Sequence, residues 1–264
     1  MALSPEQIER RRSFIGGSDA NTLVKGDPIE IENLRLFKLN RRDADDLSDI
    51  LQVELGSYTE PFNRRWFTKK TGHVVTNDGD ERMSLDFPFM CCTLDGLVRT
   101  ENATYVFEAK NVSAFASIEE IIERYYPQLQ HNIFVTGADG AFLSVIFGNH
   151  KWEIADIPLD EDFTKALLDI ETEFWRCVET DQQYMPLPVP KPAILATVKR
   201  DMQGHNEWAS AAADWLENKE AAKKFTDAAS SLKGLVDDEV VEAFGHGIVA
   251  KRAKNNAITI REAK

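Results

Sequence analysis

Cysteine is scarce in this chain, which leaves little scope for disulfides or metal clusters. The 264 residues include three cysteines: Cys91 and Cys92 are adjacent, and Cys177 stands alone. Adjacent cysteines are poor partners for each other, and an odd number is typical of a reducing compartment. No Cys-x-x-Cys pair or cysteine–histidine cluster occurs, which argues against structural zinc and iron–sulfur sites.

Long hydrophobic runs are also missing. No stretch of roughly 18 consecutive apolar residues occurs, so the sequence predicts no transmembrane helix. The polar first six residues do not resemble the start of a secretory signal. Together with the cysteine usage, these absences predict a cytoplasmic protein without membrane contact.

Positive charge is in short supply. The chain has 31 Lys and Arg against 44 Asp and Glu, a net charge of −13. Such a chain is a poor non-specific binder of nucleic acid over its whole surface. Any DNA contact is therefore expected at local basic clusters, of which the sequence offers Arg10-Arg11-Arg12, Arg64-Arg65, Lys69-Lys70, and Lys251-Arg252 with Lys254.

Proline is concentrated between residues 186 and 192, where four prolines predict an extended linker. We expect a core over residues 1–183, a linker over 184–197 and an extension over 198–264. The extension is predicted to hold a helix over 206–236 and strands over 240–244, 248–253 and 257–261. Its basic hairpin from residue 248 is open to three interpretations: a DNA contact, an assembly surface, or a hairpin packed on the core.

The core alternates between helical and strand patterns, which predicts an α/β fold. Ser18 and Asp19 are candidate N-caps, Glu60 falls in the first turn of its helix, and Pro127 suits the first turn of another. Residues 5–25 are expected to begin as a helix and, after the candidate caps Ser18 and Asp19, to continue as helix over 20–24. The other expected helices span 56–71, 117–125, 128–136 and 160–180, and the expected strands 73–76, 83–85, 89–94, 105–110, 141–147 and 152–157.

Two strand segments carry acidic residues that could act together. Asp95 follows an apolar run, and Glu108 and Lys110 lie thirteen and fifteen residues later. Because side chains alternate along a strand, Glu108 and Lys110 project from one face. Carboxylates on neighbouring strands beside an ammonium group suit a hard divalent cation and phosphodiester cleavage. The ordinary alternative is an Asp-Gly turn followed by a solvated strand face.

The candidate metal ligands are oxygen donors. They are the carboxylates of Glu60, Asp95 and Glu108 and the backbone carbonyl of Ala109. A set without His or Cys favours Mg²⁺ or Mn²⁺ over zinc. Lys110 is the candidate that orients or activates the attacking water and offsets charge in the transition state.

Three further residues have both a functional and an ordinary interpretation. Gln128 could hold the attacking water or a phosphate, or it could be a surface residue at a helix start. Arg11 and Ser18 could bind a terminal phosphate, or they could be an exposed arginine and a helix cap.

Five spaced segments occur together in one order. They are Arg11-x3-Ile15-x2-Ser18, Gly56-x3-Glu60, Thr93-x-Asp95-Gly96, Glu108-x-Lys110, and Tyr125-x2-Gln128-x-Gln130 followed by Val135-Thr136. On these segments the chain resembles the phage lambda exonuclease and YqaJ-type viral recombinase family of the PD-(D/E)xK nuclease superfamily, over roughly residues 8–180. Leu94 stands where the superfamily motif has proline, and Thr93 replaces a serine of the family.

The resemblance implies a restriction-endonuclease-like core, with a central mixed sheet flanked by helices and a C-terminal helix plus β-hairpin extension. It implies a Mg²⁺-dependent exonuclease that digests linear double-stranded DNA in the 5′→3′ direction. The implied metal ligands are Asp95 and Glu108, supported by Glu60. Lys110 and Gln128 are then expected to position the nucleophile, and Arg11, Ser18 and Thr93 to hold the 5′-phosphate.

The resemblance also implies partners. The 3′ overhang would pass to a single-strand annealing protein, and several copies of the chain would form a homo-oligomer, a ring trimer in the best-known relatives. A phage or prophage gene expressed in the cytoplasm of a bacterial host would fit such a protein.

Two other functions stay open at this stage. One is an endonuclease of the same superfamily acting in repair or restriction, which would cut closed circles. The other is a non-catalytic acidic adaptor in DNA metabolism, which the charge of −13 permits.

Overall fold

A five-stranded mixed sheet organises the N-terminal part of the protein. The computed structural model describes residues 5–47, 49–189, 192, 206–253 and 255–263, and it divides into two compact units, Met1–Val198 and Lys199–Lys264. In the first unit, strands β5 and β6 run parallel and the other neighbours antiparallel. The strand order is β1 (Val75–Thr76), β4 (Gly96–Arg99), β5 (Thr104–Val112), β6 (Gly140–Phe147) and β7 (Lys151–Pro158).

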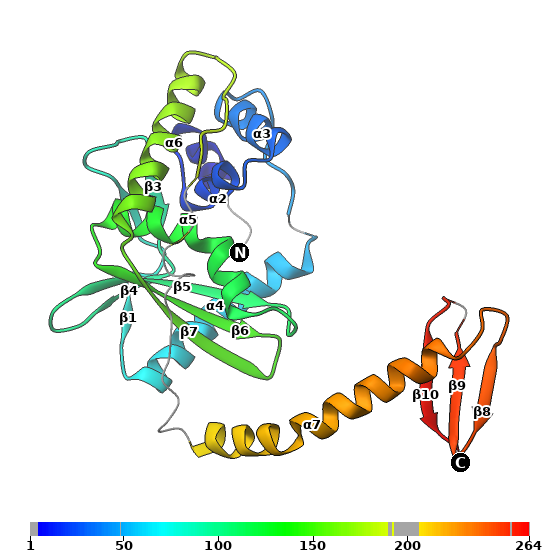
Figure 1. Cartoon of the computed structure of the whole chain (residues 1–264). Helices are drawn as coiled ribbons and strands as arrows, with labels where there is room; N and C mark the ends of the chain where they lie inside the picture. Colours follow the sequence, from blue (N-terminus) through cyan, green and yellow to red (C-terminus); the bar gives the residue numbers. More distant parts are fainter. Residues whose placement is uncertain (1–4, 48, 190–191, 193–205, 254, 264) are drawn as a thin grey trace. The chain divides into compact units, whose positions relative to one another are not determined.

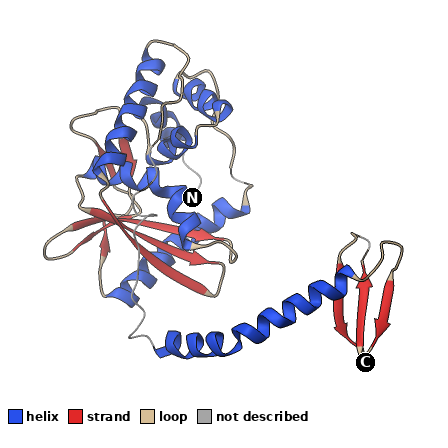
Figure 2. Cartoon of the chain, in the orientation of Figure 1, coloured by secondary structure: helices blue, strands red, loops and turns tan. Residues whose placement is uncertain are grey.

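Helices cover both faces of this sheet (Figure 2). Helix α5 (Ile118–Thr136) makes the crossover that a parallel β5–β6 pair requires. Its apolar face packs with Val106 of β5 in the main core cluster. On the other face, Phe67 of helix α4 (Leu51–Thr71) meets the ring of Phe107 at 5.0 Å. The alternation along β5 thus sends Val106, and with it Glu108, toward α5.

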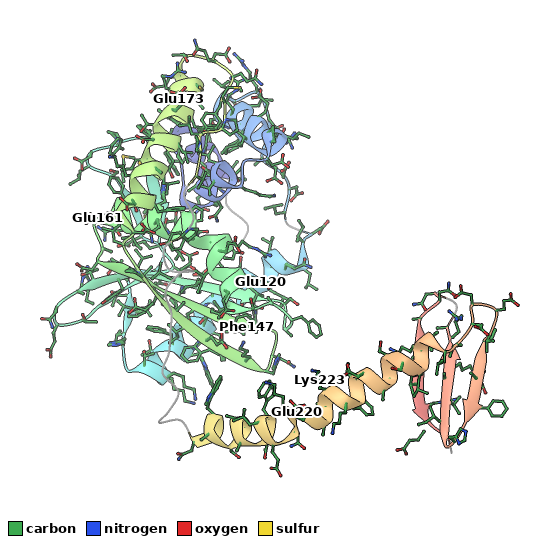
Figure 3. The ribbon with its side chains drawn as sticks, in the orientation of Figure 1. Glu120, Phe147, Glu161, Glu173, Glu220 and Lys223 are labelled. Atoms are coloured by element: carbon green, nitrogen blue, oxygen red, sulfur yellow. The ribbon has the colours of Figure 1, made fainter. Side chains whose placement is uncertain are left out.

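Of the remaining elements of the first unit, α2 (Gly17–Lys25), α6 (Glu161–Glu179), β2 (Glu81–Met83) and β3 (Cys91–Thr93) adjoin α5 (Figure 1). Helix α2 packs on α5 and on α6, while β2 and β3 pair as a small antiparallel sheet. Figure 3 labels Glu161 and Glu173 along α6. The other elements are α1 (Pro5–Arg10), the short 3-10 helix η1 (Arg11–Ser13) and α3 (Pro28–Lys38).

The N-terminal stretch over residues 5–25 is helical on both sides of an interruption, as the predicted second helix start implies. It breaks at Phe14 and Ile15, because Ile15 forms a β-bridge to Met90. The prediction of Ser18 or Asp19 as N-cap is wrong. Gly16 caps α2, and the Asp19 carboxylate accepts the Gly16 amide at 2.9 Å from the third helical position.

Helix α4 begins at Leu51, five residues before the predicted start. Gly56 lies inside it, since one glycine costs a helix only about 1 kcal/mol. Glu60 is therefore the tenth residue of the helix, and its predicted place in the first turn is wrong.

The two helices predicted on either side of Pro127 are one helix, α5, which continues through the proline. Gln128 consequently lies in the helix interior and not at a helix start. The ordinary alternative for the Asp-Gly pair, a hairpin turn, is not what the structure has: Asp95 lies in a bend and Gly96 begins strand β4. Gly96 permits this because a Cβ there would lie 2.2 Å from Val75 Cγ1 on β1.

Helix α3 was not predicted, although its sequence carries a clear start signal. Asp27 accepts the amides of Ile29 and Glu30, and Pro28 occupies the first helical position.

The segment expected to begin the linker packs on the first unit. Tyr184 is buried, and its ring meets Phe174 at 5.5 Å. Val189 is partly buried against the same cluster. Of the predicted linker, residues 190–191 and 193–197 lie outside the described residues.

The second unit contains helix α7 (Asn206–Gly234) and an antiparallel sheet of β8 (Glu242–Gly245), β9 (Ile248–Arg252) and β10 (Ile258–Glu262), in the order β10-β9-β8. The helix and all three strands predicted for the extension are confirmed, and the strands form one sheet. Two of its basic residues are engaged locally: Lys251 pairs with Glu242 at 3.3 Å, and Arg252 donates to the carbonyl of Val236 at 3.1 Å. Lys254 and Lys264 lie outside the described residues.

No helix in the described ranges combines the length and the hydrophobicity needed to cross a membrane.

Candidate active site

Strand β5 presents Glu108 and Lys110 on its α5-facing side, as the alternation predicts. Glu108 is 2% exposed, and Lys110 Nζ lies 2.6 Å from its Oε1. The same ammonium group sits over the Tyr125 ring, 4.6 Å from the centroid. Burial alone would lower the pKa of Lys110, but the carboxylates of Glu108 and Asp95 outweigh it and raise that pKa. Lys110 is therefore held as a cation.

Asp95 reaches β5 from the residue before β4. Its Oδ2 accepts the backbone amide of Ala109 at 2.9 Å. Burial, and next the negative charge of Glu108, raise the pKa of Asp95 to about 7. Two carboxylates are thus held close together, and the protonation of Asp95 changes near neutral pH.

Glu60 approaches this pair from α4. Burial, and then the charge of Asp95, raise the pKa of Glu60, which is ion-paired with Arg64. Arg64 also donates to the Asp95 carbonyl at 3.2 Å and pairs with Asp78 at 3.2 Å. The sequence placed Arg64 in a basic cluster, but no pattern indicated that it joins α4 to the Asp95 segment.

Gln128 touches the same carboxylate as Lys110. Its Nε2 donates to Glu108 Oε1 at 2.7 Å. Proline at 127 disturbs the preceding helical turn. Next to it, the backbone amide of Gln128 donates to Asn21 Oδ1 on α2 at 3.0 Å. Asn21 Nδ2 in turn donates to Gln128 Oε1 at 3.2 Å. Asn21 thereby fixes which end of the Gln128 amide faces Glu108, a role that sequence reasoning missed.

Asn132, one turn along α5, completes this contact. Its Nδ2 donates to Glu108 Oε2 at 3.4 Å, and its Oδ1 is buried without a partner among the described residues. A Cβ on Gly17 would lie 2.5 Å from that oxygen. Glycine at 17 therefore allows α2 to approach α5 closely enough for the Asn21–Gln128 bonds to form.

The donor chemistry of Asp95 and Glu108 fits a hard divalent cation, since both offer carboxylate oxygens. Their proximity, expressed in the raised pKa of Asp95, is the arrangement that a bound cation relieves. Among the described residues, no three His, Cys, Asp or Glu side chains converge as ligands for one ion. In this arrangement Glu60 is engaged by Arg64, so its role beside a metal stays a prediction, as does that of the Ala109 carbonyl.

Arg11 and Ser18 come together at the start of α2. Arg11 Nη2 donates to Ser18 Oγ at 2.8 Å and to Asp19 Oδ1 at 3.1 Å. The buried Lys38 ammonium pairs with the other oxygen of Asp19 at 2.7 Å. Thr93 is exposed on β3, and within the described residues no hydrogen bond joins it to Arg11 or Ser18. Its predicted phosphate contact therefore stays a prediction.

Other polar residues of α5 are structural. His131 is fully buried between Glu171 Oε1 at 2.9 Å and the Cys91 carbonyl at 3.0 Å. Gln130 donates to the Pro158 carbonyl at 2.9 Å and accepts the Asp160 amide at 3.0 Å. It thereby holds the junction between β7 and α6.

Comparison with known families decides the relationship. The model of the YqaJ-like viral recombinase domain matches residues 7–139, just over half of the chain. The chain belongs to this YqaJ-like family. The matched range includes the α2 start, Asp95, Glu108, Lys110 and Gln128. No curated protein sequence matches the chain significantly.

Solved structures show where the YqaJ-like fold recurs. LHK-Exo in complex with dAMP has a TM-score of 0.57 at 17% identity, over 67% of this chain and 94% of that one. A second structure of LHK-Exo, an alkaline exonuclease from Laribacter hongkongensis, has a TM-score of 0.56 at 14% identity, with the same coverage. A phage related exonuclease from Haemophilus somnus 129PT has a TM-score of 0.50 at 10% identity, over 64% and 96%.

At such low sequence identity, the structural similarity to these proteins establishes the fold alone. The YqaJ-like chain has the α/β PD-(D/E)xK architecture, with a central mixed sheet flanked by helices, and the predicted fold class is confirmed. Family and fold together support a nuclease enzyme in viral-type recombination.

Proposed function

We propose that this protein is a Mg²⁺-dependent exonuclease, with Mn²⁺ as the alternative ion, that digests one strand of linear double-stranded DNA from its 5′ end. The observation that carries the proposal is the contact of Lys110 and Gln128 with one buried carboxylate, Glu108, beside Asp95. The 3′ overhang would pass to a single-strand annealing protein.

Asp95 and Glu108 are the residues proposed to hold the cation, with Glu60 as the third carboxylate. A bound Mg²⁺ supplies Lewis-acid polarisation of the phosphate and a more acidic attacking water. Lys110, kept as a cation by its two carboxylate neighbours, offsets the negative charge that develops on the phosphorus oxygens. Gln128 Nε2 donates to the Glu108 carboxylate. We assign to the same amide the orientation of the attacking water.

Recognition of the 5′ end is assigned to the start of α2. Arg11 and Ser18 offer charge and a hydroxyl beside the first-turn amides, a suitable combination for a terminal phosphate. Local positive charge for the duplex lies on α4, where Arg64, Arg65 and Lys69 line a surface pocket. This limited patch accords with a chain whose net charge is −13.

The test is digestion of end-labelled linear duplex carrying 5′-phosphate or 5′-hydroxyl ends, with and without Mg²⁺. We expect Mg²⁺-dependent release of 5′ nucleotides, fastest from the phosphorylated end. Lys110→Ala should lower the rate about 100-fold or more, while Lys165→Ala, at an exposed lysine of α6, should not. Normal digestion by a folded Lys110→Ala protein would refute the site, and cleavage of covalently closed plasmid would favour the endonuclease alternative.

Arg11→Ala tests the end-binding role separately. The variant should digest hydroxyl ends at the normal rate and lose its preference for phosphorylated ends. Arg41→Ala, at an exposed arginine paired with Asp181, is the matched control. An equal loss on both kinds of end would remove Arg11 from phosphate recognition.

A further inference from the structure

Helix α7 carries an apolar stripe with a seven-residue repeat. If Trp208 is taken as position a of a heptad, seven of the eight a and d positions in the helix are apolar. These positions are Trp208, Ala211, Trp215, Asn218, Ala222, Phe225, Ala229 and Leu232. A repeat sustained over four heptads is typical of helices that wind around one another with a left-handed supercoil.

The described residues of the second unit do not bury the stripe between Ala211 and Leu232. The structure describes every residue of α7, and none of them is buried. Trp215 is 61% and Phe225 77% exposed. Within its own unit, α7 contacts strand β10. Just after the helix, the Val236 carbonyl accepts a hydrogen bond from Arg252 of β9. A helix about 43 Å long gains little stability from propensity alone, so this face needs a packing partner.

Charge is distributed as a helix pair requires. The charged residues in the middle of α7 lie away from the stripe: Glu217, Glu220, Lys223, Lys224 and Asp227, of which Figure 3 labels Glu220 and Lys223. Asp214 and Lys219 flank the stripe at heptad positions g and e. When two such helices lie parallel and in register, Asp214 of each faces Lys219 of the other. Small residues, Ala212, Ala221 and Ala228, fill other flanking positions and permit close approach.

We propose that α7 pairs in parallel and in register with α7 of a second copy of this chain. The occupant is a second copy because the flanking charges complement those of the same helix: every Asp214–Lys219 contact occurs twice about the pair axis. Asn218 also meets Asn218 of the other copy in this register, so each amide has a polar neighbour.

Cysteine cross-linking of the full-length protein tests register and direction. Ala222→Cys places a thiol at position a, where the two copies meet, and Asp227→Cys places one on the outer face of the same helix. The native cysteines are buried. Under mild oxidation, Ala222→Cys should form disulfide-linked pairs nearly completely and Asp227→Cys should remain mostly uncrosslinked. Equal cross-linking at both positions, or none at position 222, would overturn the proposal.

Charge exchange tests the choice of occupant. Lys219→Asp should raise the dissociation constant of the α7 pair about tenfold, as sedimentation and Ala222→Cys cross-linking report. Adding Asp214→Lys to the same chain should restore pairing, because the complementary contacts are re-formed with opposite signs. Failure of this rescue would show that α7 packs against another surface, either this chain's own first unit or a different protein. Nuclease activity is not the readout, so the outcome is independent of the proposed function.

Discussion

At the scale of single residues, the orientation of Gln128 depends on Asn21. Asn21 accepts the Gln128 backbone amide and donates to its side-chain oxygen, which leaves Nε2 for Glu108. Asn21→Asp keeps the acceptor and removes the donor, and its charge repels Gln128 Oε1. The amide should then turn its oxygen toward Glu108. We expect kcat on linear duplex to fall about tenfold with little change in KM.

The control for this variant is Asn149→Asp, which makes the same substitution in the exposed turn after β6. It should leave both constants unchanged. An Asn21→Asp enzyme with normal kcat would show that Asn21 only helps to pack α2 on α5.

Asp95 makes the stability of the folded protein depend on pH. Its pKa is raised in the folded protein to about 7, so the folded state disfavours the charged carboxylate. This destabilisation is absent below about pH 4, the pKa of Asp95 in the unfolded chain. It grows as the pH rises and is complete above about pH 7. Without metal, Asp95→Asn should therefore stabilise the fold at pH 8 by on the order of 2 kcal/mol, a value discounted for solvent screening, and should not do so at pH 4.

Thermal unfolding at the two pH values measures the Asp95 effect. Added Mg²⁺ should stabilise the unmodified protein at pH 8 and have little effect on Asp95→Asn, because the variant lacks one proposed ligand. An equal gain at pH 4 and pH 8 would mean that packing, not charge, is responsible.

At the scale of elements, a buried ion pair joins α5, α6 and β3. Burial alone would lower the pKa of His131, but Glu171 outweighs it and raises that pKa. The stability from this pair is therefore fully present below pH 6.5 and is lost as pH rises through the folded pKa. Glu171→Gln should lower the free energy of unfolding by about 2 kcal/mol at pH 6, and by less at pH 9.5.

Urea unfolding at both pH values tests the His131–Glu171 pair. Glu173→Gln, on the same helix in a pair with Arg176 at the surface, is the matched control and should leave stability nearly unchanged. A loss from Glu171→Gln that does not depend on pH would contradict the assignment of His131 as a cation.

Element boundaries show where local patterns lose predictive value. The sequence pattern predicts that one helix begins at Gly56 and that Pro127 lies in the first turn of another. Pro127 and Gly56 instead lie inside α5 and α4. Helix α5 packs on the core along most of its length, and α4 packs on the sheet through Asn63 and Phe67. That packing exceeds the local cost of either residue.

At the scale of the whole molecule, every proposed site residue belongs to the first unit, Met1–Val198. Deleting residues 206–264 should therefore leave Mg²⁺-dependent digestion within about twofold per site, while removing the association that α7 provides. Gel filtration and the digestion assay on one preparation measure both effects. Loss of folding in the truncated chain would show that the second unit supports the first.

The sequence by itself determined the features that depend on neighbours along the chain. Glu108 and Lys110 share a face because alternation is a property of any strand, and the spaced motifs placed the chain in its family. Tertiary structure decided what surrounds them. Asn21 meets Gln128 across 107 residues, and Glu171 meets His131 across 40. No local pattern specifies such contacts, because they form only when the packing of helices on one sheet brings distant segments together.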